Sequence, residues 1–396
     1  MKKLFSGFYS PTEEQIKASW SNTKTLFIFD TNVLLNLYTY TKNTREDFFK
    51  ILEKVSDNIW LPYHVGLEYQ RRRLNVIKNE KKVFQDIEKY LTSIEKNISN
   101  GEFNKLKLKQ RLPDLFNKSE ELHSKIKDLL TIYRDDVKKW NKEQPDVRSS
   151  DSIRKKIDEL FDDKVGNPFE QENLNKIFKE GEERYNKKIP PGFEDKKEKE
   201  KADNFTYKRL DYIPMYGDLI IWKQIIEKAK DEDIESVVFV TDDVKEDWWY
   251  ILDSNGKKEI GVRAELREEI YRESSISSFE LLTSTSFMKN GKEFLALEEI
   301  KEASIAEAKN TAKNRKEEYQ EKIQRRLIDI DKLNYDAIKQ AEQSQQALRN
   351  MSGLGILNKS NIMSDELRKQ VEQNQQALRN MSGLGIFNTI ADELKK

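Results

Sequence analysis

Acidic residues stand at the ends of short apolar runs that lie far apart in the chain. Asp30 follows the run 26–29, and the pair Asp242 and Asp243 follows the run 237–240. Unbroken apolar runs of this length indicate strands that are buried on both faces, as in a parallel sheet. Because the C-terminal ends of parallel strands share one edge of the sheet, these carboxylates can converge there.

Two further carboxylates stand near the starts of predicted helices. Glu68 lies in the first two turns of a helix that begins at Tyr63, and Asp218 opens a helix over 219–229. Each carboxylate also has an ordinary explanation. An Asp at a helix start is a good N-cap, and a Glu one turn before an Arg forms an exposed ion pair. The sequence alone leaves capping and metal binding open for these positions.

Crowded carboxylates raise one another's pKa unless a cation neutralises them. The chain has no cysteine and only two histidines, which excludes a thiolate site and a His-rich site. An all-oxygen site favours Mg²⁺ or Mn²⁺. One or two such ions can activate water and offset the charge that develops during cleavage of a phosphodiester.

Basic residues accompany the acidic ones. Arg71 and Arg72 follow Glu68 directly, and a second basic group surrounds two aromatic residues in the loop after residue 193. Interleaved basic and aromatic side chains can follow a phosphate backbone and stack on bases, although a solvated face or a plain linker has the same composition. The candidate nucleic-acid contacts are Arg71, Arg72, Lys196, Lys197, Lys208 and Arg209.

The elements that must position these residues alternate between strands and helices. Short apolar runs predict strands at 25–29, 58–61, 236–240 and 279–282, with an edge strand at 259–262. Helical spacing of apolar residues predicts helices at 44–55, from residue 63 onward, at 219–229 and at 263–271. This alternation is typical of an α/β fold with a mainly parallel sheet.

Domain organisation follows from shifts in composition along the 396 residues. Residues 1–73 and 189–290 form the predicted core. Residues 74–188, charged and low in glycine with apolar residues three and four apart, form a predicted helical insertion. Residues 291–340 form a long helix or linker, with a polar helix over 292–333. Residues 341–396 carry a duplicated motif.

The duplicated motif reads EQSQQALRNMSGLGI at 342–356 and EQNQQALRNMSGLGI at 372–386. Two copies are too few for a solenoid. We interpret the pair as a docking peptide for a protein partner or for self-association, in which two weak sites gain from effective concentration. A duplication without a present role is the alternative.

Several classes of protein are excluded or disfavoured by composition. Basic and acidic residues number 71 each, so the net charge is zero and any affinity for nucleic acid must come from local basic patches. No apolar run approaches the length of a membrane span, about 20 residues, and the N-terminus does not have the pattern of a signal peptide. We therefore expect a cytoplasmic protein with no membrane association.

The segments FDTNVLLNLY, GLEYQ, YGDLIIW and FVTDD, taken in this order, resemble the PIN-domain nucleases. The resemblance is strongest to the PIN-like branch with a long helical insertion, and it spans roughly residues 24–290. It implies a three-layer α/β fold and a nuclease dependent on Mg²⁺ or Mn²⁺ that usually acts on RNA. It assigns Asp30, Glu68, Asp218 and Asp243 as metal ligands, and Asn32 and Thr241 as polar supports. Asp242 is assigned as an assisting carboxylate, with its taking the place of Asp243 as the alternative.

The resemblance leads to one functional expectation and two alternatives. The expected function is an endoribonuclease that acts as a toxin-like or phage-defence effector. A structure-selective DNA nuclease is the first alternative, because related acidic sites cut DNA. A non-catalytic nucleic-acid-binding or scaffold protein, organised by the helical insertion and the repeated tail, is the second.

Overall fold

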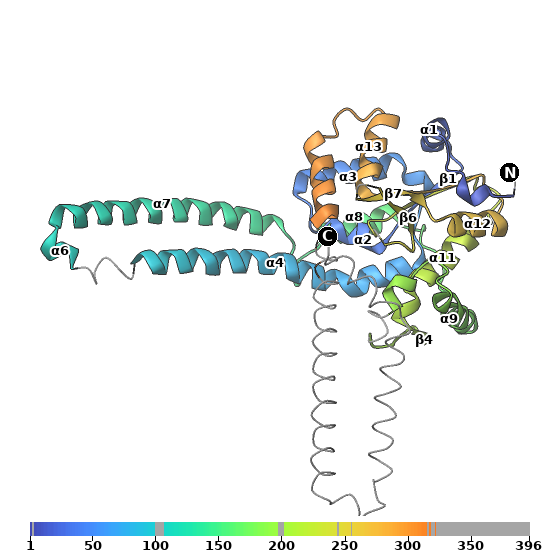
Figure 1. Cartoon of the computed structure of the whole chain (residues 1–396), viewed down its shortest axis with the longest axis horizontal. Helices are drawn as coiled ribbons and strands as arrows, with labels where there is room; N and C mark the ends of the chain where they lie inside the picture. Colours follow the sequence, from blue (N-terminus) through green and yellow to red (C-terminus); the bar gives the residue numbers. More distant parts are fainter. Residues whose placement is uncertain are drawn as a thin grey trace, which may run out of the picture. The chain divides into compact units, whose positions relative to one another are not determined.

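The computed structural model describes residue 1 and residues 4–99, 107–196, 202–243, 245–254 and 256–314, together with 317 and 321. All of these except residue 321 belong to one compact unit, Met1–Glu317, whose elements are labelled in Figure 1. The predicted docking repeats at 342–356 and 372–386 lie outside the described residues, as do Lys197 and most of 315–340.

A sheet of four parallel strands forms the centre of this unit. In sheet order the strands are β2 (Ile59–Trp60), β1 (Thr25–Phe29), β5 (Ser236–Val240) and β8 (Ser278–Leu282). Phe29 lies opposite Val240, and Val240 lies opposite Leu282. The strands therefore end in register, so the residues that follow them share one edge. The predicted mainly parallel sheet is confirmed.

Helices cover both faces of the sheet and give three layers. The first face is covered by α1 (Glu13–Ser21), α3 (Lys42–Lys54) and α13 (Ser284–Phe294). There the ring of Phe287 in α13 lies 5.1 Å from the ring of Phe29, centroid to centroid. On the other face, Trp222 of α11 (Gly217–Lys228) packs 5.3 Å from Phe279 of β8. The three-layer α/β fold is confirmed.

The helical region expected after residue 73 is built on one long helix. Helix α4 (Tyr63–Ser99) runs through residue 73 without a break, so the helix that carries Glu68 also forms one arm of a hairpin with α7 (Pro113–Glu143). Figure 1 shows the two arms side by side, and Arg134 of α7 donates to Glu95 of α4 over 2.8 Å. The other helices of the region are α6 (Leu108–Arg111), α8 (Ser152–Leu160) and α9 (Gln171–Asn186).

Two antiparallel hairpins lie outside the central sheet. Strands β3 (Phe205–Tyr207) and β4 (Leu210–Tyr212) form the first, where the sequence predicted a loop. Strands β6 (Trp249–Asp253) and β7 (Lys257–Val262) form the second. The strand expected at 259–262 therefore pairs with β6 and does not extend the edge of the central sheet.

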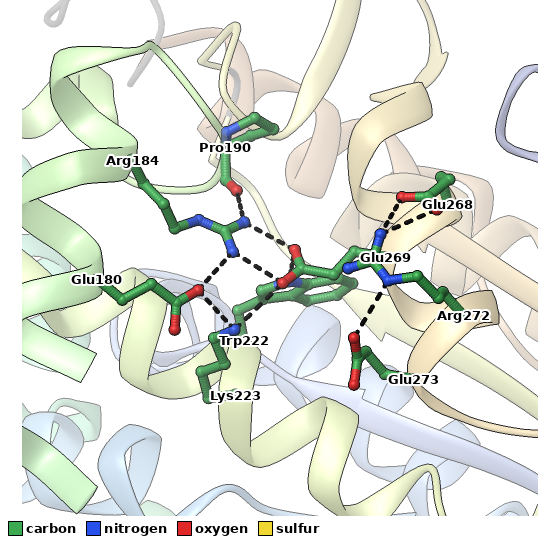
Figure 2. A network of polar contacts seen from close by, with 9 residues as sticks. All are labelled: Glu180, Arg184, Pro190, Trp222, Lys223, Glu268, Glu269, Arg272 and Glu273. Atoms are coloured by element: carbon green, nitrogen blue, oxygen red, sulfur yellow. Dashed lines mark hydrogen bonds and ion pairs between the residues drawn. The ribbon is translucent and has the colours of Figure 1, made fainter. Parts of the chain in front are cut away.

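A buried ion network joins three helices on the α11 side of the sheet (Figure 2). The guanidinium of Arg184 in α9 binds the carboxylate of Glu269 in α12 (Ala264–Glu273) through two bonds of 2.7 Å. The indole N–H of Trp222 donates to the same carboxylate over 2.9 Å, and Lys223 lies 3.2 Å from it. Arg184 also donates to the Pro190 carbonyl. The network thus fixes the start of the loop that follows residue 189.

The polar helix expected over 292–333 is interrupted in the structure, so that prediction is wrong at its beginning. Helix α13 ends at Phe294, Ala296 has a left-handed φ of 52°, and the next helical segment runs over 302–314. Leu297 and Ile300 in the connection are buried. Both side chains belong to the hydrophobic core of the unit.

Candidate functional site

Asp30 stands at the C-terminal end of β1 and caps the short helix α2 (Thr31–Asn36). Its Oδ1 accepts from the backbone N–H of Thr31 over 2.6 Å. Its Oδ2 accepts from the Thr241 hydroxyl over 2.7 Å and from the side-chain amide of Asn32. The capping role considered from sequence is therefore present. It also fixes the direction of the carboxylate.

The side chains of Asn32 and Thr241 both donate hydrogen bonds to the Asp30 carboxylate. The Asn32 amide nitrogen lies 3.2 Å from the Thr241 hydroxyl, and the Asn32 carbonyl accepts from the backbone N–H of Asp242 over 2.9 Å. The Thr241 hydroxyl also accepts from the backbone N–H of Asp243 over 3.1 Å. These bonds tie the ends of β1 and β5 together across the sheet edge.

Glu68 reaches the same edge from the second turn of α4. Its Oε2 accepts from the Thr31 hydroxyl over 3.0 Å, and its Oε1 lies 3.8 Å from Nε2 of His64, one turn earlier. A side chain at Gly217 would come within 3.0 Å of this carboxylate. Glycine at the start of α11 therefore lets that helix approach Glu68 closely.

Asp218 follows in the first turn of α11, where the loop after α9 packs against it. Gly192 of that loop has a φ of +92°, and a Cβ there would lie 2.3 Å from the Tyr185 hydroxyl and 3.2 Å from the Asp218 Cβ. Only glycine meets both conditions. The loop thus forms a close wall beside Asp218.

The two aspartates after β5 differ in their surroundings. Asp242 is buried, and its oxygens accept from the Asn36 amide over 2.6 Å and from both the backbone N–H and the hydroxyl of Ser284, over 2.8 and 2.6 Å. Asp243 is half-buried, lies 3.0 Å from the Lys245 ammonium, and is not bound in this way to the core. The contacts of Asp242 join α2 to α13, which favours a structural role for it.

The pKa of Asp30 shows which other carboxylates lie near it. The pKa of Asp30 is raised to about 7, with burial as the largest cause. The hydrogen bond from Thr241 acts in the opposite direction, and the charges of Asp218, Asp243 and Glu68 each raise the pKa further. The structure therefore brings these four carboxylates within electrostatic range, and we call them the acidic edge.

A fifth carboxylate near the acidic edge was missed by the sequence reasoning. Asp247 is 1% exposed, and its Oδ2 accepts from the backbone N–H groups of Gly192 and Glu194 over 2.9 and 3.2 Å. Burial raises its pKa to about 8, with Asp243 and Asp218 adding to the rise and Lys245 opposing it. Its one available signal was the pair of tryptophans that follows it. Asp247 anchors the loop that walls Asp218.

The donor set of the acidic edge fits a hard divalent ion. All its members are carboxylates that destabilise one another's charge, and nearby hydroxyl and amide groups already fix Asp30. Among the residues that the structure describes, no three His, Asp or Glu side chains already converge tightly enough to hold an ion. An ion would therefore have to draw these carboxylates inward.

The predicted nucleic-acid contacts are spread over three places. Arg71 and Arg72 are exposed on α4, and the Arg71 guanidinium lies 3.5 Å from the centre of the Phe205 ring. Lys208 and Arg209 form the exposed turn of the β3–β4 hairpin. Lys196 instead donates to the Asn186 side chain over 2.8 Å. Arg71 and the hairpin are therefore neighbours, whereas Lys196 is bonded to the end of α9.

Fold and site together define a class of protein: a three-layer α/β domain with a parallel sheet whose strand ends gather carboxylates. A family model described as PIN like domain matches residues 26–266, and the chain belongs to this nuclease-type family. The matched segment runs from β1 into α12 and includes the acidic edge, Asp242 and Asp247. No curated protein and no solved structure matches the chain. In the described residues, no helix combines the length and apolar character needed to cross a membrane.

Proposed function

We propose that the chain is an endoribonuclease that hydrolyses phosphodiester bonds with Mg²⁺ or Mn²⁺ at the acidic edge. One observation carries this proposal. Asp30 stands at a strand end where burial, together with the charges of three other carboxylates from different parts of the chain, raises its pKa to about 7. Such mutual repulsion costs stability and is compensated when a cation binds.

Asp30, Glu68, Asp218 and Asp243 would hold one or two ions. When bound, a divalent ion supplies Lewis acidity, which makes water more nucleophilic and offsets charge on the phosphoryl oxygens. The chain's own residues orient the ligands. Thr31 bonds to both Asp30 and Glu68, so that one residue fixes the relative position of two carboxylates.

Asn32, Thr241 and Asp242 act through the ligands. The first two hold the Asp30 carboxylate by hydrogen bonds. Asp242 assists from a distance, because its bonds to Asn36 and Ser284 fix the end of β5 against α2 and α13. Arg71, Lys208 and Arg209 supply cationic contacts for the phosphate backbone of the substrate.

The direct test is cleavage of labelled single-stranded RNA and DNA by the purified full chain, with Mn²⁺, Mg²⁺ or EDTA. We expect RNA cleavage with either metal and none with EDTA. Asp218→Asn should abolish it, whereas Asp253→Asn, at an exposed aspartate of β6, should not. Cleavage of DNA alone would favour the DNA nuclease, and binding without cleavage would favour the scaffold.

A toxin-like or phage-defence role is the second part of the proposal, and it rests on the family resemblance. It makes a separate prediction in cells. Induced synthesis of the wild-type chain in the bacterial cytoplasm should stop growth, and the same amount of Asp218→Asn should not. Equal growth with both chains would contradict the toxin-like role and leave the nuclease assignment to the test in vitro.

A further inference from the structure

A cavity of about 520 Å³ lies beside the first turns of α4. Leu67 and Arg71 line it, whereas Glu68, between them in sequence, points to the acidic edge. Gly66 and Gln70 also line it. Successive helical residues are about 100° apart, so the cavity lies on the side of α4 that faces largely away from Glu68. Its floor is apolar and includes Leu61 and Phe161, both buried.

One wall of the cavity is aromatic and cationic. Tyr207 and Lys208 reach it from the β3–β4 hairpin, and Tyr207 remains 45% exposed. The turn that presents them is sharply bent, with φ of 50° at Lys208 and 65° at Arg209. Behind it, Phe205 stacks on Tyr212 with 5.2 Å between ring centres. The wall is thus backed by packed rings.

Acidic side chains also line the cavity. Asp158, Asp162 and Asp163 line it, and the Gln70 side chain contributes an amide. The lining therefore contains both cations and hydrogen-bond acceptors. A ligand that carries both negative charge and N–H donors matches this lining.

The floor of the cavity contains a glycine that the protein's own packing does not require. A Cβ at Gly66 would meet Leu61 at 3.5 Å and Val165 at 4.0 Å, which are ordinary contacts. Alanine would stabilise the helix at this position. Glycine keeps the space beside α4 open at a cost in stability, which is expected where a ligand enters.

We propose that this cavity, which we call the base pocket, holds one unpaired nucleobase of a single-stranded nucleic acid. Tyr207 stacks on the base, Arg71 and Lys208 contact the neighbouring phosphates, and the amino-bearing edge faces the aspartates. The inference rests on the proposed function, since that strand is the substrate of the acidic edge. Glu68 lies on the same two turns of α4, so a strand whose base is held here reaches Glu68 by passing around the helix.

The experiment uses the full chain and short single-stranded RNA with 2-aminopurine at one position, in EDTA so that binding is separated from cleavage. Wild type should quench the fluorescence on binding. Tyr207→Ala should weaken binding at least about fivefold, the lower end for loss of one stacked base. Tyr250→Ala, at a tyrosine of β6 that is 48% exposed, is the matched control and should bind as wild type.

A second pair of variants fills the base pocket from below. Gly66→Leu should weaken binding about as much as Tyr207→Ala, and Gly66→Ala, which adds one methyl group at contact distance, should weaken it less. Circular dichroism melting checks that both fold. Oligouridine, which has no exocyclic amino group, should bind more weakly than oligoadenosine or oligocytidine of the same length.

The outcomes separate the base pocket from the nuclease. Unchanged binding and quenching in Tyr207→Ala and Gly66→Leu would overturn the base pocket, and cleavage by wild type with Mn²⁺ would leave the nuclease standing. Quenching that depends on Tyr207 in a chain that cleaves no nucleic acid would support the pocket and overturn the nuclease. Equal affinity for oligouridine would overturn the proposed orientation of the base.

Discussion

The pKa values of two carboxylates in this domain, the buried Glu269 and the half-buried Asp30, are shifted in opposite directions. Glu269, in the ion network of Figure 2, has its pKa lowered to about 2, because the Arg184 and Trp222 bonds and the Lys223 charge outweigh the effect of burial. Asp30, at the acidic edge, has its pKa raised to about 7, because burial and three carboxylates outweigh the hydrogen bond from Thr241.

The difference lies in the partners, not in the carboxylates themselves. The domain builds a bidentate guanidinium pair where three helices must be joined. At the strand ends it gathers like charges, an arrangement that reduces stability unless a cation neutralises them. Perturbed groups of the second kind mark functional sites more often than those of the first. Four predictions break or sharpen this contrast.

The largest effect is expected at the acidic edge and should appear in the rate. Asp30→Asn removes one charge and keeps the shape, so Mn²⁺-dependent RNA cleavage should fall by about 10³-fold or more, about 4 kcal/mol in the activation barrier. Thermal melting should show that the variant stays folded. Glu269→Gln, assayed where it is fully folded, should retain its rate. Equal losses of cleavage rate in both variants would contradict a functional difference between the acidic edge and the ion network.

The next effect should appear in stability and at the ion network. Glu269→Ala leaves the buried Arg184 guanidinium with Glu180 and the Pro190 carbonyl as partners. The free energy of unfolding, measured with urea, should fall by about 3 kcal/mol. Glu268→Ala is the control. It breaks a pair with Arg272 in which both side chains are more than half exposed, and should cost less than about 1 kcal/mol. Similar losses would refute a special role for burial.

The same network predicts a dependence on acid. The folded pKa of Glu269, about 2, lies below its ordinary value of 4.5. Its stabilisation is therefore complete above pH 4.5 and is lost as pH falls toward 2, by about 3 kcal/mol in all. Unfolding free energies measured between pH 6 and pH 3 should fall less steeply in Glu269→Gln than in wild type. If the free energy of unfolding fell equally with pH in both proteins, the lowered pKa of Glu269 would be contradicted.

The smallest effect concerns metal binding without substrate. Mg²⁺ or Mn²⁺ at about 100 times its Kd should stabilise the folded chain by about 2.7 kcal/mol, seen as a higher melting temperature. Asp218→Asn should lose most of this gain, because it removes one proposed ligand. Glu269→Gln, although less stable, should keep it. A gain of the same size in Asp218→Asn would place the bound ion elsewhere.

The sequence predicts the frame of the site well because its signals are local. Apolar runs mark the strands that end before Asp30 and Thr241, and parallel order alone then brings these ends together. Neighbouring residues do not reveal which of Asp242 and Asp243 is bonded to the core. That difference depends on Asn36 and Ser284, which are remote in the sequence and bond only to Asp242.

Two features escaped prediction for related reasons. Asp247 stands in a charged stretch, and its burial depends on Gly192 and Glu194, more than fifty residues earlier. The β3–β4 hairpin turns through Lys208 and Arg209, whose left-handed conformations are usually occupied by glycine or asparagine. Tertiary contacts decide both cases, so patterns of neighbouring residues do not reveal them.

Helix α4 gives the site a mechanical connection. It spans 37 residues, about 55 Å at 1.5 Å per residue, and is a single uninterrupted helix. No break or hinge therefore interrupts the helix between Glu68 and Ser99. A molecule that binds the far end of α4 would therefore be joined by one continuous helix to the carboxylate that meets Thr31.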